Sequence, residues 1–457
     1  MLFPKSQEYV ERNEMQKIYN PKRGDWKSII KRPTQSVADI EGVVNGIFEE
    51  IAKDGDHTIK KYTEKYDGAV LHNLKVSRDE IEEAKLLVSK ELKGAIELAK
   101  LNIETFHKAQ KTDKVEVETS NGVQCWQEKR PIQKVGLYIP GGTAPLFSTI
   151  LMLAIPANLA GCQEIVLCSP PDTDGIINPA ILYTAALCGV TQIFKVGGIQ
   201  AIAGMTFGTE SIPQVYKIFG PGNQFVTVAK QLATKHGVAI DMPAGPSELL
   251  VAADDTADAA FVASDLLSQA EHGVDSQVIL VSTSKDMIDA VEREVEKQIE
   301  ALPRRDIAQK AIDNSKLIYV EDDQIAIDLI NEYGPEHYII CVKNEDLYLD
   351  NTFNAGSVFI GNYTPESAGD YASGTNHTLP TNGYAKQYSG VNLDSFLKSM
   401  TFQKISKKGI QNIGSAIEIM AETEGLQAHK NAVTLRLNNL KEEVKKRKGG
   451  EDQNIKN

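Results

Sequence analysis

The sequence predicts an α/β protein with two doubly wound parallel sheets and helical extensions at both ends. Its 457 residues are too many for one ordinary hydrophobic core, so two or more domains are expected. From Val135 onward, short apolar strands alternate with helical stretches in two successive series. The regions before residue 110 and after about residue 393 have mainly helical periodicity instead.

The N-terminal region divides into three parts. Residues 1–36 are polar and are expected to form an arm on the surface. Residues 37–110 repeat apolar side chains at helical spacing, with Ser77 and Asp79 near the start of one helix. The next stretch, "VEVETSNGVQCWQEKRPI", alternates around an Asn-Gly pair, which is typical of a β-hairpin.

The two central series consist of short apolar runs. The first series contains "KVGLYIP", "EIVLCSP", "QIFKVGG" and "VYKIFGPG", and the second contains "SELLVAAD", "QVILVSTS", "KLIYVED" and "HYIICV". Because helical stretches separate these runs, each series predicts a largely parallel sheet, and two doubly wound units fit better than one oversized sheet. The remainder, which begins with "SFLKSMTFQKIS", indicates an appended helical tail over 393–457.

Composition excludes several classes of protein. The chain has 49 basic and 62 acidic residues, a net charge of −13, which disfavours a nucleic-acid or anionic-membrane partner. Five cysteines without a CxxC pair argue against a disulfide framework or a thiolate zinc site, and we expect all five thiols to be packing residues. The N-terminus has no apolar signal segment, and "TILMLAIPANLAGC" is too short to span a membrane. A cytoplasmic protein is therefore expected.

Three glycine-rich turns follow strands of the first series: "YIPGGTAP", "VGGIQAIAG" and "IFGPGNQF". The carboxyl ends of parallel strands are where backbone N–H groups and helix N-termini favour phosphates. None of the three turns has the G-x-G-x-x-G spacing of an ordinary dinucleotide site, and each alone would usually be a matter of turn geometry. Together they favour a nucleotide or another phosphate-bearing ligand.

Acids and histidines cluster in the second half of the chain. In "YGPEHYIICV", Glu336 and His337 stand side by side before an apolar run, and burying both is costly unless they are used or well paired. The alternative is purely structural: Glu336 caps the turn, and His337 is its neighbour by chance. In "LLSQAEHGVDSQ", Gln269 and His272 share one helix face and could hold zinc, although a helix-terminal histidine is the alternative. Further acids and histidines occur in the long loop 364–385 and in the tail: Glu366, Asp370, His377, Glu424 and His429.

Seven motifs together resemble those of the histidinol dehydrogenase family. In chain order they are "YIPGGTAP", "GPGNQFVTVAK", "IDMPAGPSELLVAADD", "ASDLLSQAEHGVDSQVIL", "YGPEH", "AGSVFIGNYTPESAGDYASGTNHTLPT" and "AHKNAVTLR". The resemblance runs from about residue 20 to about residue 440. It implies the oxidation of L-histidinol to L-histidine in two NAD-dependent steps through an enzyme-held aldehyde, with one zinc ion per subunit.

The resemblance also implies a domain plan. Two incomplete Rossmann-like domains with helical N- and C-terminal extensions are expected. The first would comprise 37–137 and 248–392 and carry the metal and the catalytic pair, and the second, 138–247, would bind NAD. The tail, 393–457, would be exchanged between the subunits of a homodimer.

Site residues follow from the resemblance, motif by motif. It implies Glu336 as the group that activates water and His337 as the general base, a role that suits an imidazole titrating near neutrality. The implied zinc ligands are Gln269, His272, Asp370 and His429. The implied NAD contacts are Tyr138, Gln200 and Asn223. The implied substrate contacts are Ser247, Gln269, His272, His337, Asp370, Glu424 and His429.

Three rival functions stay open from the sequence. A dehydrogenase of the same family could act on another small amino or sulfonated alcohol. A zinc hydrolase could use the same Gln/His/Asp/His donor set with Glu336 activating water, and would turn over without NAD. A catalytically silent metal-binding protein would bind zinc and show neither activity.

Overall fold

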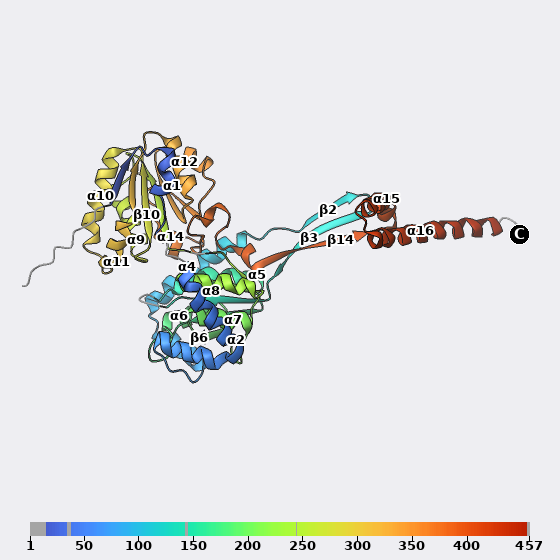
Figure 1. The fold of residues 1–457 in the computed structure, drawn as a ribbon, viewed down its shortest axis with the longest axis horizontal. Coiled ribbons are helices and arrows are strands. Elements are labelled where there is room, and N and C mark those ends of the chain that lie inside the picture. The colour runs from blue at the N-terminus through green and yellow to red at the C-terminus, as the bar shows by residue number, and fades with distance from the viewer. Residues whose placement is uncertain (1–14, 34–37, 142–144, 244, 455–457) are drawn as a thin grey trace, which may run out of the picture. The chain divides into compact units, whose positions relative to one another are not determined.

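The computed structural model describes residues 15–33, 38–141, 145–243 and 245–454. The chain divides into two compact units, one formed by Met1–Gln110 with Ile132–Phe396 and the other by Lys111–Pro131 with Leu397–Asn457. The first unit contains two parallel sheets with helices packed on them (Figure 1). The α/β fold with two parallel sheets that the sequence predicts is therefore confirmed.

The six-stranded sheet has the order β1-β11-β10-β9-β12-β13, with every pair parallel. Its strands are β1 (Gln16–Tyr19), β9 (Glu248–Ala253), β10 (Gln277–Ser282), β11 (Lys316–Tyr319), β12 (His337–Cys341) and β13 (Ser357–Ile360). One face packs on α9 (Ala259–Ala270), α10 (Lys285–Ile299) and α11 (Arg305–Asp313). The other face packs on α1 (Trp26–Ile29), α12 (Asp323–Tyr333) and α13 (Glu345–Asp350), and α14 (Glu366–Tyr371) follows β13. Because β9, β10 and β12 are buried on both faces, their interiors are apolar, and their polar residues stand at the strand ends.

Part of the expected N-terminal arm belongs to this sheet. β1 pairs in parallel with β11, and the side chains of Trp26 and Ile30 are buried in the core. The prediction of a surface arm is therefore wrong for residues 16–30, and the rest of 1–36 includes 1–14 and 34–36, which lie outside the described residues. A four-residue edge strand with polar flanks has little periodicity of its own, and its pairing with β11 stabilises it.

The five-stranded sheet has the order β6-β5-β4-β7-β8 and is also parallel throughout. Its strands are β4 (Lys134–Tyr138), β5 (Glu164–Ser169), β6 (Gln192–Lys195), β7 (Lys217–Phe219) and β8 (Ala239–Ile240). Helices α3 (Arg78–Leu87), α4 (Lys90–Ala109), α5 (Phe147–Ala160) and α6 (Pro179–Leu187) contribute to one core cluster beside it. Helices α2 (Ala38–Asp67), α7 (Gly198–Phe207) and α8 (Gln224–Lys235) contribute to the other.

Helices α2, α3 and α4 thus pack with the five-stranded sheet, whereas the family resemblance implied that 37–137 belong with 248–392. The apolar stripe of α4 meets α5, that of α3 meets α6, and that of α2 meets α7. Helical periodicity reveals that a stripe is buried, but the pattern does not specify which sheet covers it.

The second unit is an antiparallel sheet of order β14-β3-β2 followed by two helices. Its elements are β2 (Val115–Ser120), β3 (Val123–Pro131), β14 (Leu397–Ile405), α15 (Lys407–Thr423) and α16 (Gln427–Asn454). The predicted hairpin is confirmed, with Gly122 at φ +82° in its turn. Within the described residues, no helix is both long enough and apolar enough to cross a membrane.

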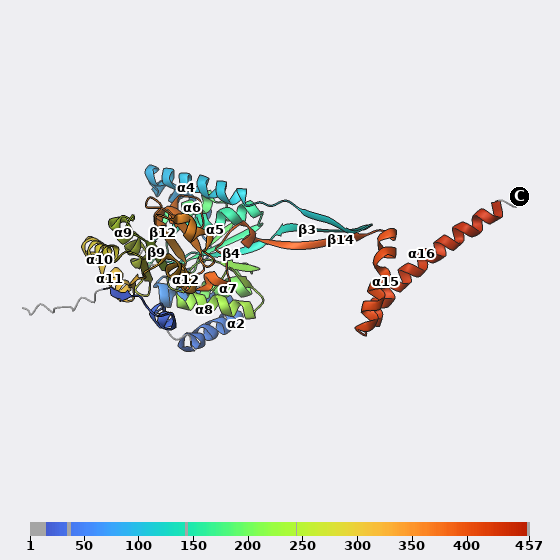
Figure 2. The same ribbon diagram turned by 90° about the horizontal axis from the view of Figure 1, so that it is seen from above.

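The helical prediction is wrong for 397–405, which form β14 beside β3 (Figure 2). Nine residue pairs join the two strands, and the rings of Trp126 and Phe402 stack with their centroids 5.3 Å apart. Cross-strand pairs of this kind stabilise a sheet from segments far apart in sequence, which a local pattern does not reveal. The later helices, α15 and α16, confirm the helical prediction for 407–423 and 427–454, and residues 455–457 lie outside the described residues.

Candidate active site

Glu336 and His337 lie at the amino edge of the six-stranded sheet. Helix α12 ends at Tyr333, and Gly334 adopts the left-handed conformation (φ +62°) that terminates many helices. Pro335 then cannot extend the helix, so the chain turns directly into β12, whose first residue is His337. This turn brings both side chains into one buried place, where Glu336 Oε2 is 3.7 Å from His337 Nδ1.

The neighbouring strand holds this pair through its main chain. Glu248, the first residue of β9, donates its N–H to Glu336 Oε2 at 2.9 Å. Its carbonyl oxygen lies 3.3 Å from His337 Nδ1, in reach of a hydrogen bond from that nitrogen. Ser247, predicted to contact substrate, precedes Glu248 at the same edge and accepts a hydrogen bond from the Gln277 N–H. The amino ends of β9 and β12 therefore form the wall of the site.

Carboxylates from α14 lie on the other side of His337. Its Nε2 is 3.5 Å from Asp370 Oδ1, and its Nδ1 is 3.6 Å from Glu366 Oε1. His337, Glu366 and Asp370 offer ligand atoms within 4.8 Å of one another. We assigned no role to Glu366 from the sequence, although its spacing of four from Asp370 places both on one helix face. Among the described residues, His337 Nε2 is a buried atom without a hydrogen-bond partner.

Burial and mutual charge shift the pKa values of this cluster. Desolvation raises the pKa of Glu336 and that of Glu366 to about 8 each. Burial alone would lower the pKa of His337, but the carboxylates of Glu366 and Glu336 raise it to about 10. Burial alone would raise the pKa of Asp370, and His337 holds it below its ordinary value. So much negative charge in one buried place needs a cation, either protons or a metal ion.

The predicted metal ligands of the first unit lie around this cluster. The Gln269 amide is satisfied when its nitrogen faces Glu366 and its oxygen accepts from the Glu248 N–H at 3.1 Å. His272, just beyond α9, is open to solvent, while desolvation lowers its pKa and the charge of Asp370 opposes that shift. An imidazole, a carboxylate and an amide oxygen form a donor set that zinc accepts, so the residues fit the metal.

Two predicted site residues belong to the second unit. Glu424 is the residue that ends α15, and His429 is in the first turn of α16. Both side chains are exposed within that unit. Their predicted roles as a substrate contact and a zinc ligand stay predictions.

The three residues predicted to bind NAD line one cavity of about 940 Å³: Tyr138, Gln200 and Asn223. The cavity lies at the carboxyl ends of β4, β5 and β7, where α6, α7 and α8 begin. The Tyr138 hydroxyl accepts a hydrogen bond from the Gly198 N–H at 3.1 Å, and Asn223 caps α8 by accepting from the Val226 N–H. Helix N-termini favour anions, so this cavity suits a phosphate-bearing ligand. In the first glycine-rich turn, residues 142–144 lie outside the described part.

The five thiols are not part of the acid–base cluster around His337. Cys162, Cys168, Cys188 and Cys341 are buried, and Cys125 is half-buried. Desolvation raises the pKa of Cys162, Cys188 and Cys341 to about 12, so these thiols stay neutral. The prediction that the cysteines are packing residues is confirmed for the four buried ones.

Comparison with known proteins identifies the family. The sequence matches the family model of histidinol dehydrogenase over residues 30–437. The histidinol dehydrogenase of Bacteroides thetaiotaomicron is 57% identical over 427 residues, which cover 93% of this chain and 100% of the relative. That of Escherichia coli K12 is 52% identical, covering 92% of this chain and 98% of the relative. The crystal structure of histidinol dehydrogenase from Elizabethkingia anophelis matches with a TM-score of 0.92 at 57% identity, covering 93% of this chain and 99% of that one. The chain therefore belongs to the histidinol dehydrogenase family, whose members are oxidoreductases.

Proposed function

We propose that this protein oxidises L-histidinol to L-histidine through L-histidinaldehyde, with zinc as a bound metal and two NAD as hydride acceptors. The observation that carries the proposal is the buried pair of Glu336 and His337, with the Glu366 and Asp370 carboxylates within 4.8 Å of the His337 ring nitrogens, in a chain of this family. NAD, when bound, takes one hydride in each of the two oxidations.

His337 acts as the general base. In the first oxidation it accepts the proton of the substrate hydroxyl as hydride leaves the carbinol carbon, which yields the aldehyde. Its Nε2, buried and without a hydrogen-bond partner among the described residues, is the free ring atom for this transfer. The Glu248 carbonyl beside Nδ1 favours a proton on that nitrogen, so Nε2 is the basic atom of the neutral ring. The neighbouring carboxylates raise the pKa of His337 to about 10, so a bound cation would have to offset their charge for the ring to be neutral near pH 7.

Glu336 acts in the second oxidation, which consumes water. Its carboxylate accepts a proton from water as the oxygen adds to the aldehyde carbon, while His337 returns to the carbonyl oxygen the proton it took in the first oxidation. The resulting hydrate then loses hydride to the second NAD and a hydroxyl proton to His337, which gives the acid. Burial makes the Glu336 carboxylate a stronger base than an exposed one, since its pKa is raised to about 8. The N–H of Glu248 fixes one of its oxygens.

Gln269, His272, Asp370 and His429 would hold the zinc ion. When bound, zinc supplies a Lewis-acidic anchor for the substrate's imidazole and amine. Ser247 and Glu424 would complete the substrate contacts. Tyr138, Gln200 and Asn223 would bind NAD in the cavity of the five-stranded sheet, which supports the proposal because helix N-termini favour its pyrophosphate.

A homodimer with exchanged tails is part of the proposal. Each site would take Glu424 and His429 from the partner's tail, an exchange that closes in a two-fold dimer. Mixing His272→Ala with His429→Ala chains tests this. Exchange leaves one site with both lesions and one intact, so about half of one wild-type dimer's activity should return. If each tail served its own chain, mixing would restore nothing.

The test of the function is an assay with L-histidinol and NAD, followed by the absorbance of reduced nicotinamide and by the formation of L-histidine. We expect two NAD reduced for each histidine formed. A faster rate with another amino or sulfonated alcohol would mean that this alcohol, and not L-histidinol, is the substrate. Hydrolysis without NAD, or zinc binding without either activity, would contradict the proposal.

A further inference from the structure

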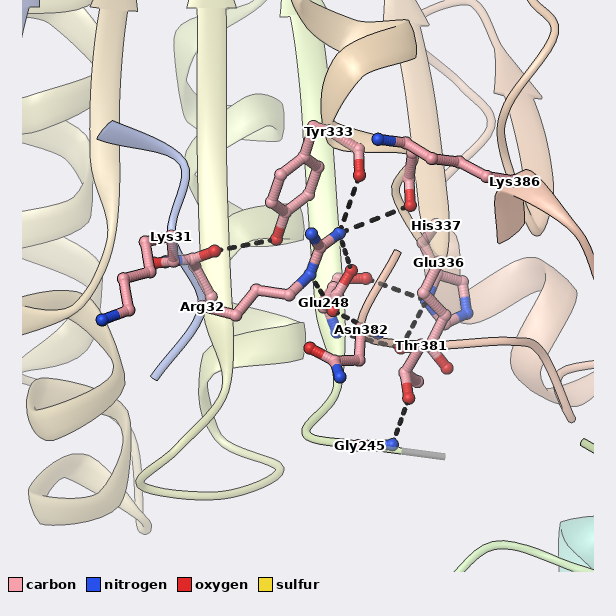
Figure 3. A network of polar contacts seen from close by, with 12 residues as sticks. Lys31, Arg32, Gly245, Glu248, Tyr333, Glu336, His337, Thr381, Asn382 and Lys386 are labelled. Carbon is pink, nitrogen blue, oxygen red and sulfur yellow. Dashed lines mark hydrogen bonds and ion pairs between the residues drawn. The ribbon is translucent and has the colours of Figure 1, made fainter. Parts of the chain in front are cut away.

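An arginine from the N-terminal segment reaches the wall of the site. Arg32 follows α1, and its side chain is only 14% exposed. Its guanidinium donates to both carboxylate oxygens of Glu248, from Nε to Oε1 and, at 2.8 Å, from Nη2 to Oε2 (Figure 3). The Glu248 side chain, 2% exposed, also accepts from the Asn382 N–H. A two-pronged contact of this kind fixes the orientation of both groups.

The same guanidinium holds the end of α12. Its Nη2 donates to the Tyr333 carbonyl at 2.9 Å, and its carbon lies 3.9 Å from the centroid of the Tyr333 ring. Tyr333 is three residues before Glu336, so the turn that carries the catalytic pair begins at a point anchored by Arg32. Cations also suit the carbonyl end of a helix.

Arg32 therefore anchors both strands of the wall at once. On β9 it holds the side chain of Glu248. The main-chain N–H and carbonyl of the same residue contact Glu336 and His337. On the β12 side it locks the turn from which those two residues emerge. A buried ion pair is weak evidence for stability, because desolvation offsets its attraction. The Arg32–Glu248 ion pair is better explained as a contact that fixes the geometry of the site.

We propose that Arg32 and Glu248 are positioning residues for the acid–base pair Glu336 and His337. Neither has to touch substrate. This inference rests on the proposed function for its kinetic arm. A displacement of about 1 Å in a catalytic group can slow a reaction by about 10², so loosening this anchor should lower kcat and leave the KM for the substrate nearly unchanged.

The test compares Arg32→Met, Arg32→Lys and Glu248→Gln with Lys17→Met as the control. Lys17 is also in the N-terminal segment and pairs with Asp289, and its loss removes an ion pair of the same sheet away from the site. We expect Arg32→Met and Glu248→Gln to lower kcat at least tenfold in both half-reactions, with zinc content kept and KM within about twofold. Arg32→Lys should recover part of the loss, because lysine keeps the charge without the two-pronged contact. Lys17→Met should keep wild-type kcat.

A crystal structure of Arg32→Met gives a second readout that needs no turnover. We expect the Glu336 carboxylate to leave its hydrogen bond with the Glu248 N–H. Wild-type kcat in Arg32→Met, or an unmoved Glu336, would overturn the proposal. If Arg32→Met does not fold, the near-isosteric Glu248→Gln decides both readouts. If the wild type fails to oxidise histidinol, the proposed function fails while the crystal structure still tests the anchor.

Discussion

The two parallel sheets of the first unit present their sites at opposite ends. In the five-stranded sheet, the cavity lined by Tyr138, Gln200 and Asn223 lies where strands end and helices begin. In the six-stranded sheet, Glu336 and His337 lie where strand β12 begins. In the proposed function, the rule that ligands bind at the carboxyl ends of parallel strands holds for the five-stranded sheet and not for the six-stranded sheet.

The difference follows from the helix termini at each end. The cavity is bordered by Asn178, Gly198 and Asn223, which lie at the starts of α6, α7 and α8. The N-terminus of a helix carries partial positive charge and suits an anion. At the amino edge of the other sheet, α9 and α12 end, and their carbonyls suit cations. One topology thus offers an anion site at one end and a cation site at the other.

The largest expected effect is that of removing zinc, which tests the proposed cation site at the amino edge of the six-stranded sheet. Chelation should reduce histidinol oxidation to background, and added zinc should restore it, because zinc anchors the substrate in the proposed mechanism. Replacing all five cysteines by alanine should leave the zinc content unchanged, as measured by elemental analysis. Full activity in verified metal-free protein would remove the metal from the account.

Glu336→Gln should have the next largest effect, and only on one step. Losing a positioned acid–base group costs about 10²–10⁴ in rate. Because only aldehyde oxidation consumes water, that step should slow far more than alcohol oxidation, measured with L-histidinaldehyde and L-histidinol in single turnovers. His337→Asn is the comparison and should slow both steps. Equal impairment of the two steps in Glu336→Gln would end the water-activating role.

Asn223→Asp should weaken NAD binding at the anion end. Aspartate caps a helix as well as asparagine does, so folding should be kept while a negative charge enters the cavity. A like charge near the pyrophosphate costs on the order of 1 kcal/mol, so the KM for NAD should rise about fivefold with little change in kcat. The opposite exchange at a cap outside the cavity, Asp258→Asn on α9, should leave this KM unaltered. An unchanged KM in Asn223→Asp would mean that NAD binds elsewhere.

Asp67 gives the smallest effect, on stability. Burial at the rim of the cavity lined by Tyr138, Gln200 and Asn223 raises the pKa of Asp67 from 3.8 to about 6. Since the folded-state pKa is raised, ionised Asp67 destabilises the fold above pH 6, and this penalty disappears as the pH falls from about 6 to about 4. Asp67→Asn should therefore raise the free energy of unfolding by about 1 kcal/mol at pH 8, a value discounted for partial exposure, and by almost nothing near pH 4. Denaturant unfolding at both pH values checks this, with exposed Asp255→Asn as the control. A gain that is the same at both pH values would contradict it.

Local patterns predicted the parts of this structure that depend on neighbours in sequence. The alternation of strands and helices and the Asn-Gly hairpin were both found this way. The long-range pairings were missed. Strand β14 depends on β3, which lies more than 260 residues earlier, and β1 depends on β11.

The candidate site divides in the same way. The Glu336–His337 pair and the spacing of Gln269 and His272 stand out in the sequence, because each pair is local. The contact between Arg32 and Glu248 spans 216 positions, and no spacing pattern could predict it. That the amino ends of β9 and β12 lie side by side, with Glu248 next to the pair, is known only from the register of the two strands.

One measurement tests the central claim, that the two sheets use opposite ends. A crystal structure of the protein with zinc and NAD, with the metal located by its anomalous scattering, shows both ligands at once. The account predicts zinc at Gln269, His272 and Asp370 beside the amino ends of β9 and β12. It predicts the NAD pyrophosphate against the starts of α7 and α8. Zinc at any other residues, or NAD outside the cavity of the five-stranded sheet, would contradict it.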